Sequence, residues 1–117
     1  MESLFERRDL NDIDLSEWNV INVESMRSMF EKAKNIRFTF EKWDTRNVRD
    51  MASMFEDIES HYLGISGWNI SSVKNMNYMF WGSRYFNENI SNWDTSNVDT
   101  LSGMFHGSVS FKADISG

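Results

Sequence analysis

The sequence predicts an α/β fold: a right-handed solenoid of 25-residue repeats with one short strand and one short helix per turn. Three observations predict it. A Val follows each repeat tryptophan after five residues, a Met-Phe pair follows after eleven, and the apolar residues between them have helical spacing. The tryptophans that set the period are Trp18, Trp43, Trp68 and Trp93. A fixed period of this length is typical of repeat proteins, whose units stack on one another.

The helix of each repeat is expected to begin at the Val and to end at the Met-Phe pair. Val98, Leu101, Met104 and Phe105 lie at i, i+3, i+6 and i+7, which places them on one side of a helix. Gly82 follows the pair in its repeat, where a positive φ ends a helix, but Lys32 and Asp57 hold that position elsewhere. We therefore expect helices, with Val, Met and Phe buried, at Val23–Phe30, Val48–Phe55, Val73–Phe80 and Val98–Phe105.

The strand of each repeat is expected at the apolar stretch that ends at the tryptophan, for example Ile90–Trp93. A strand this short is stable only when it pairs with its counterpart in the next turn. Parallel strands stack about 4.8 Å apart, whereas packed helices need about 8–10 Å. The helical side should therefore be convex, which is the geometry of a leucine-rich-repeat-like coil with Met, Phe and Trp in place of Leu.

Length and composition exclude several classes of function. The 117 residues contain no Pro and only scattered Gly, so we expect one repeat domain, residues 1–117, of about 4.7 repeats. The absence of Cys excludes disulfides and thiolate metal sites. A net charge of −6 argues against a nucleic-acid partner, and no apolar run approaches the roughly 20 residues of a membrane span. The first residues lack the features of a signal peptide.

The repeat also resembles a known family. The strings Trp93-Asp94-Thr95-Ser96-Asn97-Val98 and Gly103-Met104-Phe105-His106-Gly107-Ser108 closely resemble the tandem repeat of the BspA-like surface proteins, a repeat that is also found in mycoplasma lipoproteins. The resemblance extends over the whole chain. It implies a leucine-rich-repeat-like fold on a bacterial surface protein, with a role in adhesion or partner recognition and no enzymatic activity. It also implies a cell-surface or extracellular location, although without a signal peptide in the chain a cytoplasmic location stays open.

The fourth repeat supplies the candidate partner-binding residues. Tyr78, Trp81 and Tyr85 occupy positions that are polar in the other repeats, and Arg84 lies among them. On the predicted helix their spacing of i, i+3 and i+7 places the three aromatic residues along one edge. Aromatic residues and Arg dominate the energetics of interfaces. The alternative is that these rings only cover neighbouring turns of the stack.

Two further patterns leave alternatives open. A column of Asn and Asp follows the tryptophans (Asn19, Asp44, Asn69 and Asp94) and either binds Ca²⁺ or bonds the backbone of turns; we favour the turns and expect no metal or cofactor. Seven basic residues lie between Arg27 and Arg49, among them Lys32, Lys34 and Arg37. They form either a solvated rim or a site for an anionic partner.

The expected function is a non-enzymatic repeat scaffold for recognition of a protein or glycan, as part of a bacterial surface or adhesion protein. The alternative is a purely structural spacer within a longer surface protein. His61 and His106 fall at different positions of the repeat and predict no metal site. Phe111 and Ile115 belong to the core pattern and have no following turn, so we expect the chain to be either a segment of a longer array or one that associates end to end through apolar surface.

Overall fold

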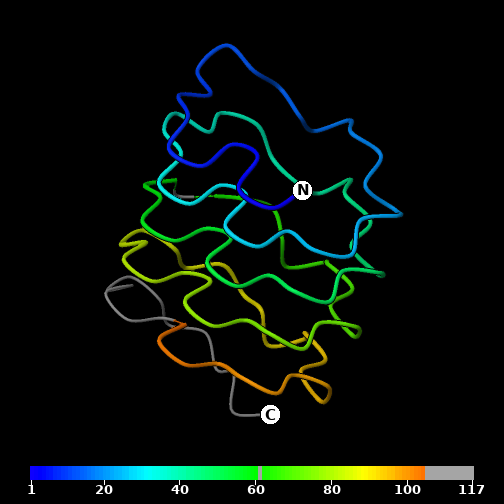
Figure 1. Ribbon diagram of the computed structural model, residues 1–117. Helices are drawn as coiled ribbons and strands as arrows, with labels where there is room; N and C mark the ends of the chain where they lie inside the picture. Colours follow the sequence, from blue (N-terminus) through cyan, green and yellow to red (C-terminus); the bar gives the residue numbers. More distant parts are fainter. Residues whose placement is uncertain (61, 105–117) are drawn as a thin grey trace.

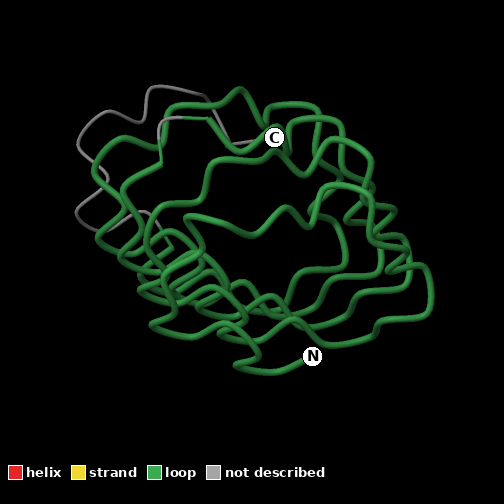
Figure 2. Ribbon diagram, turned by 90° about the horizontal axis from the view of Figure 1, so that it is seen from above, coloured by secondary structure: helices red, strands yellow, loops and turns green. Residues whose placement is uncertain are grey.

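The chain is a stack of coils in the computed structural model, which describes residues 1–60 and 62–104 (Figure 1). Coil 1 comprises residues 1–25, coil 2 residues 26–50, coil 3 residues 51–75 and coil 4 residues 76–100, and residues 101–104 begin coil 5. Seen from above, the coils lie over one another around a common interior (Figure 2). Figure 2 also shows that the described chain is drawn as loop throughout.

The prediction of one helix and one strand per turn is wrong. The described residues contain no helix, and extended pairing is limited to isolated parallel bridges. Three of these bridges form one column at the last residue of each coil, and the fourth joins Asp9 to Lys34. The column runs through Ser25, Asp50, Asn75 and Thr100. An α/β solenoid of the predicted kind is therefore excluded for this part of the chain.

Overlapping tight turns replace the predicted helices. In coil 2, the N–H groups of Met29, Glu31 and Ala33 each donate to the carbonyl three residues earlier, at 3.1, 3.2 and 2.9 Å. Ser28 and Lys32 have φ values of 55° and 58° at the third position of two of these turns. An α-helix needs negative φ at every residue and bonds between residues four apart, so this backbone cannot be helical.

The remaining N–H groups of the turn segment bond to the neighbouring coil. The N–H groups of Ser28, Phe30 and Lys32 donate to carbonyls 24 residues further along the chain, at 2.8, 3.0 and 2.8 Å. Coil 3 repeats this pattern toward coil 4. Direct backbone bonding holds two chains about 4.8 Å apart, whereas packed helices need about 8–10 Å. The turn segment therefore stacks as closely as a strand does, and the predicted convex helical side is absent.

The predicted strand before each tryptophan is also a turn. The N–H of Trp93 donates to the carbonyl of Ile90 at 3.0 Å, and Trp68 closes the same turn on Ile65 at 3.0 Å. The indole N–H of each buried tryptophan then donates to a carbonyl of the preceding coil. Trp43 reaches Leu15 at 2.8 Å, and Trp68 reaches Phe40 at 2.9 Å. The tryptophan thus fastens two coils through its side chain.

The predicted burial of the repeated apolar residues is confirmed for most of them. The Met and Phe positions of coils 2, 3 and 4 are at most 4% exposed, whereas Val23 and Val98 are partly buried and Leu101 is 43% exposed. Phe105 lies outside the described residues. The phenylalanine rings form a stacked column, with centroids 5.8 Å apart between Phe30 and Phe55 and 5.9 Å apart between Phe55 and Phe80. The core is thus a set of side-chain ladders that follow the stack.

The Asn and Asp column after the tryptophans bonds the backbone of turns. The side-chain oxygens of Asn19, Asp44, Asn69 and Asp94 each accept the N–H two residues later, at 3.0 to 3.2 Å. Local bonds of this type stabilise turns and explain the column by themselves. In the described part of the chain, no group of three or more His, Asp or Glu side chains is arranged to hold a metal ion.

Candidate functional site

The coil-4 aromatic surface comprises Tyr78, Trp81, Arg84 and Tyr85. Tyr78 and Tyr85 are 44% and 42% exposed, Arg84 is exposed, and Trp81 is half-buried. The predicted helical edge for the aromatic residues is wrong, because the segment is not helical. The residues instead occupy separate turns of the same segment. The N–H of Trp81 donates to the carbonyl of Tyr78 at 3.1 Å, and Arg84 and Tyr85 form the corner of a later turn, which begins at Ser83.

The Tyr78 and Trp81 side chains both lie against Gly103 of coil 5. A Cβ atom on Gly103 would be 2.6 Å from Cδ1 of Tyr78 and 3.7 Å from Cδ1 of Trp81. Gly103 also has a φ of 65°, so this position excludes side chains for two reasons. Tyr78 itself has a φ of 58°, as do the serines at the same position of coils 2 and 3 to within a few degrees. The backbone thus directs the tyrosine ring across the next coil while leaving almost half of its surface in solvent.

A pair of carboxyl groups lies in the column that Trp81 continues. Glu31 and Glu56 occupy the sixth residue of coils 2 and 3. Burial, the hydrogen bond with Glu31 and the charges of Glu31 and Asp57 together raise the pKa of Glu56 to about 7, against an opposing effect of Lys32. The hydroxyl of Ser28 donates to Glu31 at 3.2 Å. The Glu56 carboxyl is therefore partly protonated near neutral pH, which was not predicted from the sequence.

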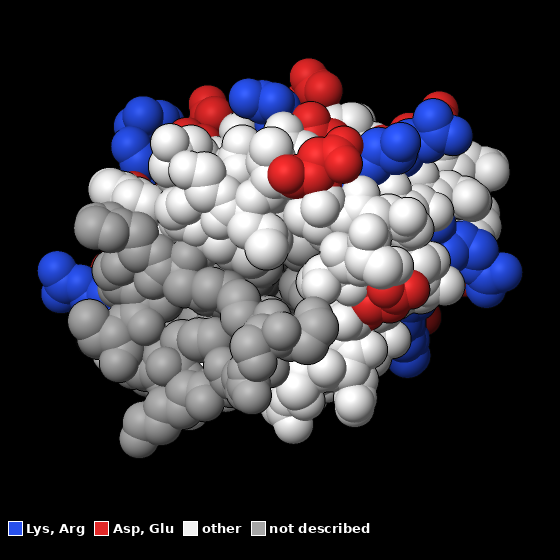
Figure 3. Space-filling model, turned by 90° about the horizontal axis from the view of Figure 1, so that it is seen from below, with Lys and Arg blue, Asp and Glu red and all other residues white. Residues whose placement is uncertain are grey.

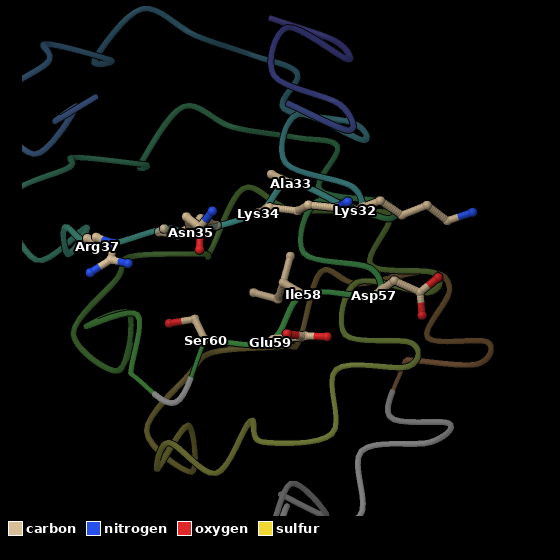
Figure 4. Close-up of a pocket in the computed structure, with 10 residues that line it drawn as sticks. Lys32, Ala33, Lys34, Asn35, Arg37, Asp57, Ile58, Glu59 and Ser60 are labelled. Atoms are coloured by element: carbon tan, nitrogen blue, oxygen red, sulfur yellow. The ribbon is translucent and has the colours of Figure 1, made fainter. Parts of the chain in front are cut away.

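A pocket of about 630 Å³ opens between coil 2 and coil 3. Figure 4 shows its two lips, formed by residues 32–37 of coil 2 and residues 57–60 of coil 3. Backbone bonding between these coils stops at Lys32 and resumes at Phe40 within the part of the chain that the structure describes. Lys34 instead bonds coil 1, through Arg8 at 2.8 Å, while the N–H of Ile58 turns away to the hydroxyl of Ser83 at 3.2 Å. The coil-2 lip is thus bonded to coil 1 and the coil-3 lip to coil 4, and the pocket lies between the two lips.

The basic segment noted in the sequence separates into two groups in the structure. Arg27, Lys42, Arg46 and Arg49 each form an ion pair with a carboxylate, at 2.5 to 3.8 Å. Lys32, Lys34 and Arg37 line the pocket and form no ion pair with any described residue. Seen from below, charged side chains lie around the rim of the molecule (Figure 3). The sequence could show the basic cluster but not which of its members were already paired.

The first coil exposes residues whose counterparts are buried further along. Leu4 is 45% and Trp18 is 38% exposed, whereas Met29 and Trp43, one coil later, are at most 3% exposed. Phe111 and Ile115, on which the expected end-to-end contact also depends, lie outside the described residues, as do His61 and His106. The described part of the chain has no helix long and apolar enough to cross a membrane.

The described residues form stacked 25-residue coils that contain no helix and are joined by backbone hydrogen bonds. These features define a repeat protein built from turns, with aromatic and basic side chains on its surface. The family model that matches residues 1–117 is described as "Mycoplasma protein of unknown function, DUF285", and the chain belongs to this family. No match was found among curated proteins or among solved structures.

Proposed function

We propose that the chain is a non-enzymatic repeat scaffold that recognises a protein or glycan partner through the coil-4 aromatic surface. The observation that carries this proposal is the exposure of Tyr78 and Tyr85, at positions that hold Ser, Asn or other polar residues in the neighbouring coils. Large aromatic side chains that remain exposed beside an Arg are suited to contact with a partner, because each buries a large area at little cost in conformational entropy.

The contacts that hold Tyr78 in place suit a surface that binds a partner. Tyr78 belongs to a turn whose backbone bonds to coil 5, through Ser102 at 2.9 Å, and its ring lies against Gly103. A side chain that is already held in place loses little freedom when a partner binds. With the resemblance to BspA-like repeats, this supports a role within a bacterial surface or adhesion protein.

The experiment replaces the aromatic surface with small polar residues. The triple variant is Tyr78→Ser, Trp81→Gln, Tyr85→Asn. Ser and Asn are found at the equivalent positions of other coils, where Ser is already accommodated at positive φ, and Gln is the uncharged counterpart of the Glu found there. Wild type and variant are tested by biolayer interferometry against immobilised glycans and extracellular-matrix proteins. We expect wild-type binding to one class of these and its loss in the triple variant. Trp18→Gln, which removes an exposed aromatic residue from coil 1, is the control and should bind as the wild type does.

A purely structural spacer is the second candidate, and the repeated backbone bonds between successive coils favour it. A spacer needs coil-to-coil regularity and no particular surface. Equal binding by the wild type and the triple variant, or binding to none of the immobilised molecules, would favour the spacer over recognition through coil 4.

A further inference from the structure

The pocket between coil 2 and coil 3 has the size of a small-molecule site. Its volume of about 630 Å³ falls within the range of roughly 300–1,000 Å³ that is usual for such sites. The buried side chains of Ala33 and Ile58 supply apolar lining. Among the described residues, the pocket lies where the backbone hydrogen bonds between coils 2 and 3 are interrupted, and Lys34 and Ile58 beside it are each bonded to other coils.

The charges of the pocket are arranged along its length. Figure 4 shows Arg37 and Ser60 toward one end, with Asn35 between Arg37 and the rest of coil 2, and Lys32 above Asp57 at the other end. Lys34 and Glu59 also line the pocket. One end therefore combines a guanidinium with a hydroxyl. The rest of the lining adds the ammonium groups of Lys32 and Lys34 and the carboxylates of Glu59 and Asp57, the latter with its Oδ1 against Gly82 of coil 4.

The cations of residues 32–37 form no ion pair with any described residue and so remain available to a ligand. Arg37 also borders a neighbouring hollow that contains Asp12 and Asp14, yet it forms no ion pair with any described carboxylate. Asp9 lies near Lys34 and Arg37, but its Oδ1 already accepts the side-chain amide of Asn35 at 2.9 Å and the N–H of Asn11 at 3.0 Å. A free anion would be drawn to Arg37 and the two lysines and repelled by Asp57 and Glu59.

We propose that this pocket binds a small zwitterionic group, with its phosphate or carboxylate between Arg37 and Ser60 and its amine beside Asp57 and Glu59. Both charges of such a ligand meet a group of opposite sign, whereas a simple anion leaves the carboxylates of the pocket without a partner and a simple amine leaves Arg37 without one. The site lies in coils 2 and 3 and does not depend on the coil-4 aromatic surface.

The test titrates the full chain with O-phosphoethanolamine, inorganic phosphate and ethanolamine at low salt and follows the backbone amide signals by NMR. O-phosphoethanolamine should shift the amides of residues 34–37 and 58–60 and bind at least about fivefold more tightly than phosphate or ethanolamine, because each of these satisfies one end only. Added salt should weaken binding. Shifts elsewhere in the chain, or equal affinity for the three probes, would overturn the proposal.

Two variants separate the ends of the pocket. Arg37→Gln should weaken O-phosphoethanolamine binding about tenfold, whereas Arg46→Gln, which makes the same change in net charge on a cation already paired with Asp44, should not. Glu59→Gln should weaken O-phosphoethanolamine binding and strengthen phosphate binding. Equal losses in Arg37→Gln and Arg46→Gln would show a general charge effect and contradict the site.

A membrane headgroup is distinguished in a separate arm. Vesicles that contain phosphatidylethanolamine carry the same charges at a lipid surface. We expect the soluble probe to bind and to compete with any vesicle binding. If the chain sediments with the vesicles but does not bind the soluble probe, it binds the bilayer surface by another route and the pocket is not the binding site.

Discussion

Glu88 takes the place of a backbone carbonyl for Ile65: its Oε1 accepts the N–H of Ile65 at 2.9 Å, although the glutamate is only 7% exposed. One coil earlier, the N–H of Phe40 donates to the main-chain carbonyl of Leu63 at 2.8 Å, the same 23 residues further along the chain. The other carboxylate oxygen of Glu88 accepts the N–H of Leu63. A buried carboxylate thus continues a backbone ladder by means of its side chain.

Replacement of Glu88 by Leu should be strongly destabilising, although the equivalent residues Ile13, Phe38 and Leu63 are all apolar. Two buried N–H groups would lose their acceptor, and we expect the free energy of unfolding to fall by about 2–4 kcal/mol in urea titrations. Glu88→Gln keeps one acceptor oxygen and should lose less. A Leu variant as stable as the wild type would mean that water or a shifted carbonyl satisfies both donors.

The phenylalanine column should be most sensitive in the middle of the stack. Phe55 is fully buried between Phe30 and Phe80, whereas Phe5 is only half-buried and stacks on Phe30 alone among the phenylalanines. Phe55→Ala should lower the free energy of unfolding by about 3–5 kcal/mol, because it removes a large buried ring and leaves a cavity. Phe5→Ala should cost much less. Equal losses in chemical denaturation would contradict a core made of stacked coils.

A glycine at a left-handed turn position should stabilise the chain. Ser53 has a φ of 58°, a conformation that costs an L-residue about 1–2 kcal/mol relative to glycine. Because glycine also makes the unfolded chain more flexible, we expect a net gain of about 0.5–1 kcal/mol for Ser53→Gly in thermal melts. The neighbouring Ala52→Gly is the control, since Ala52 is buried and has no positive φ. It should destabilise the chain.

Glu56 should make stability depend on pH around neutrality. Its pKa is raised from 4.5 to about 7 in the folded chain, so between these values the folded state binds more protons than the unfolded state. Stability should therefore be greatest below pH 4.5, as far as this group is concerned, and fall as the pH rises through 7. Because the carboxyl is partly exposed and screened by water, we expect a loss of about 1 kcal/mol.

The variant Glu56→Gln tests this assignment. It should remove that loss and be more stable than the wild type at pH 8, as measured by denaturation across a pH series. Glu24→Gln, which neutralises an exposed carboxylate beside Arg49, is the matched control and should leave the pH dependence between 4.5 and 7 in place. An unchanged pH profile in Glu56→Gln would assign the effect to another group.

The repeat, its length and most of its buried residues could be predicted because they depend on spacing and hydrophobicity alone. The column of tryptophans and the burial of Met29, Phe30 and their equivalents follow from a 25-residue period, whatever backbone lies between them. The exposure of Tyr78 and Tyr85 could also be predicted, because both residues occupy positions that are polar in coils 2 and 3. Both are exposed in the structure, although the helical edge expected for them does not exist.

The backbone conformation was decided by the tertiary structure. A spacing of i, i+3, i+6 and i+7 is compatible with a helix, but it also arises from overlapping turns whose alternate N–H groups bond to the next coil. Ser28 and Lys32 carry no sequence signal for positive φ, since among their described equivalents only Gly82 and Gly103 are glycines. These residues adopt it because the bonds between coils outweigh its local cost. Likewise, no local pattern shows that Lys32, Lys34 and Arg37 border one pocket, because the pocket exists only where two coils, 25 residues apart in sequence, part from each other.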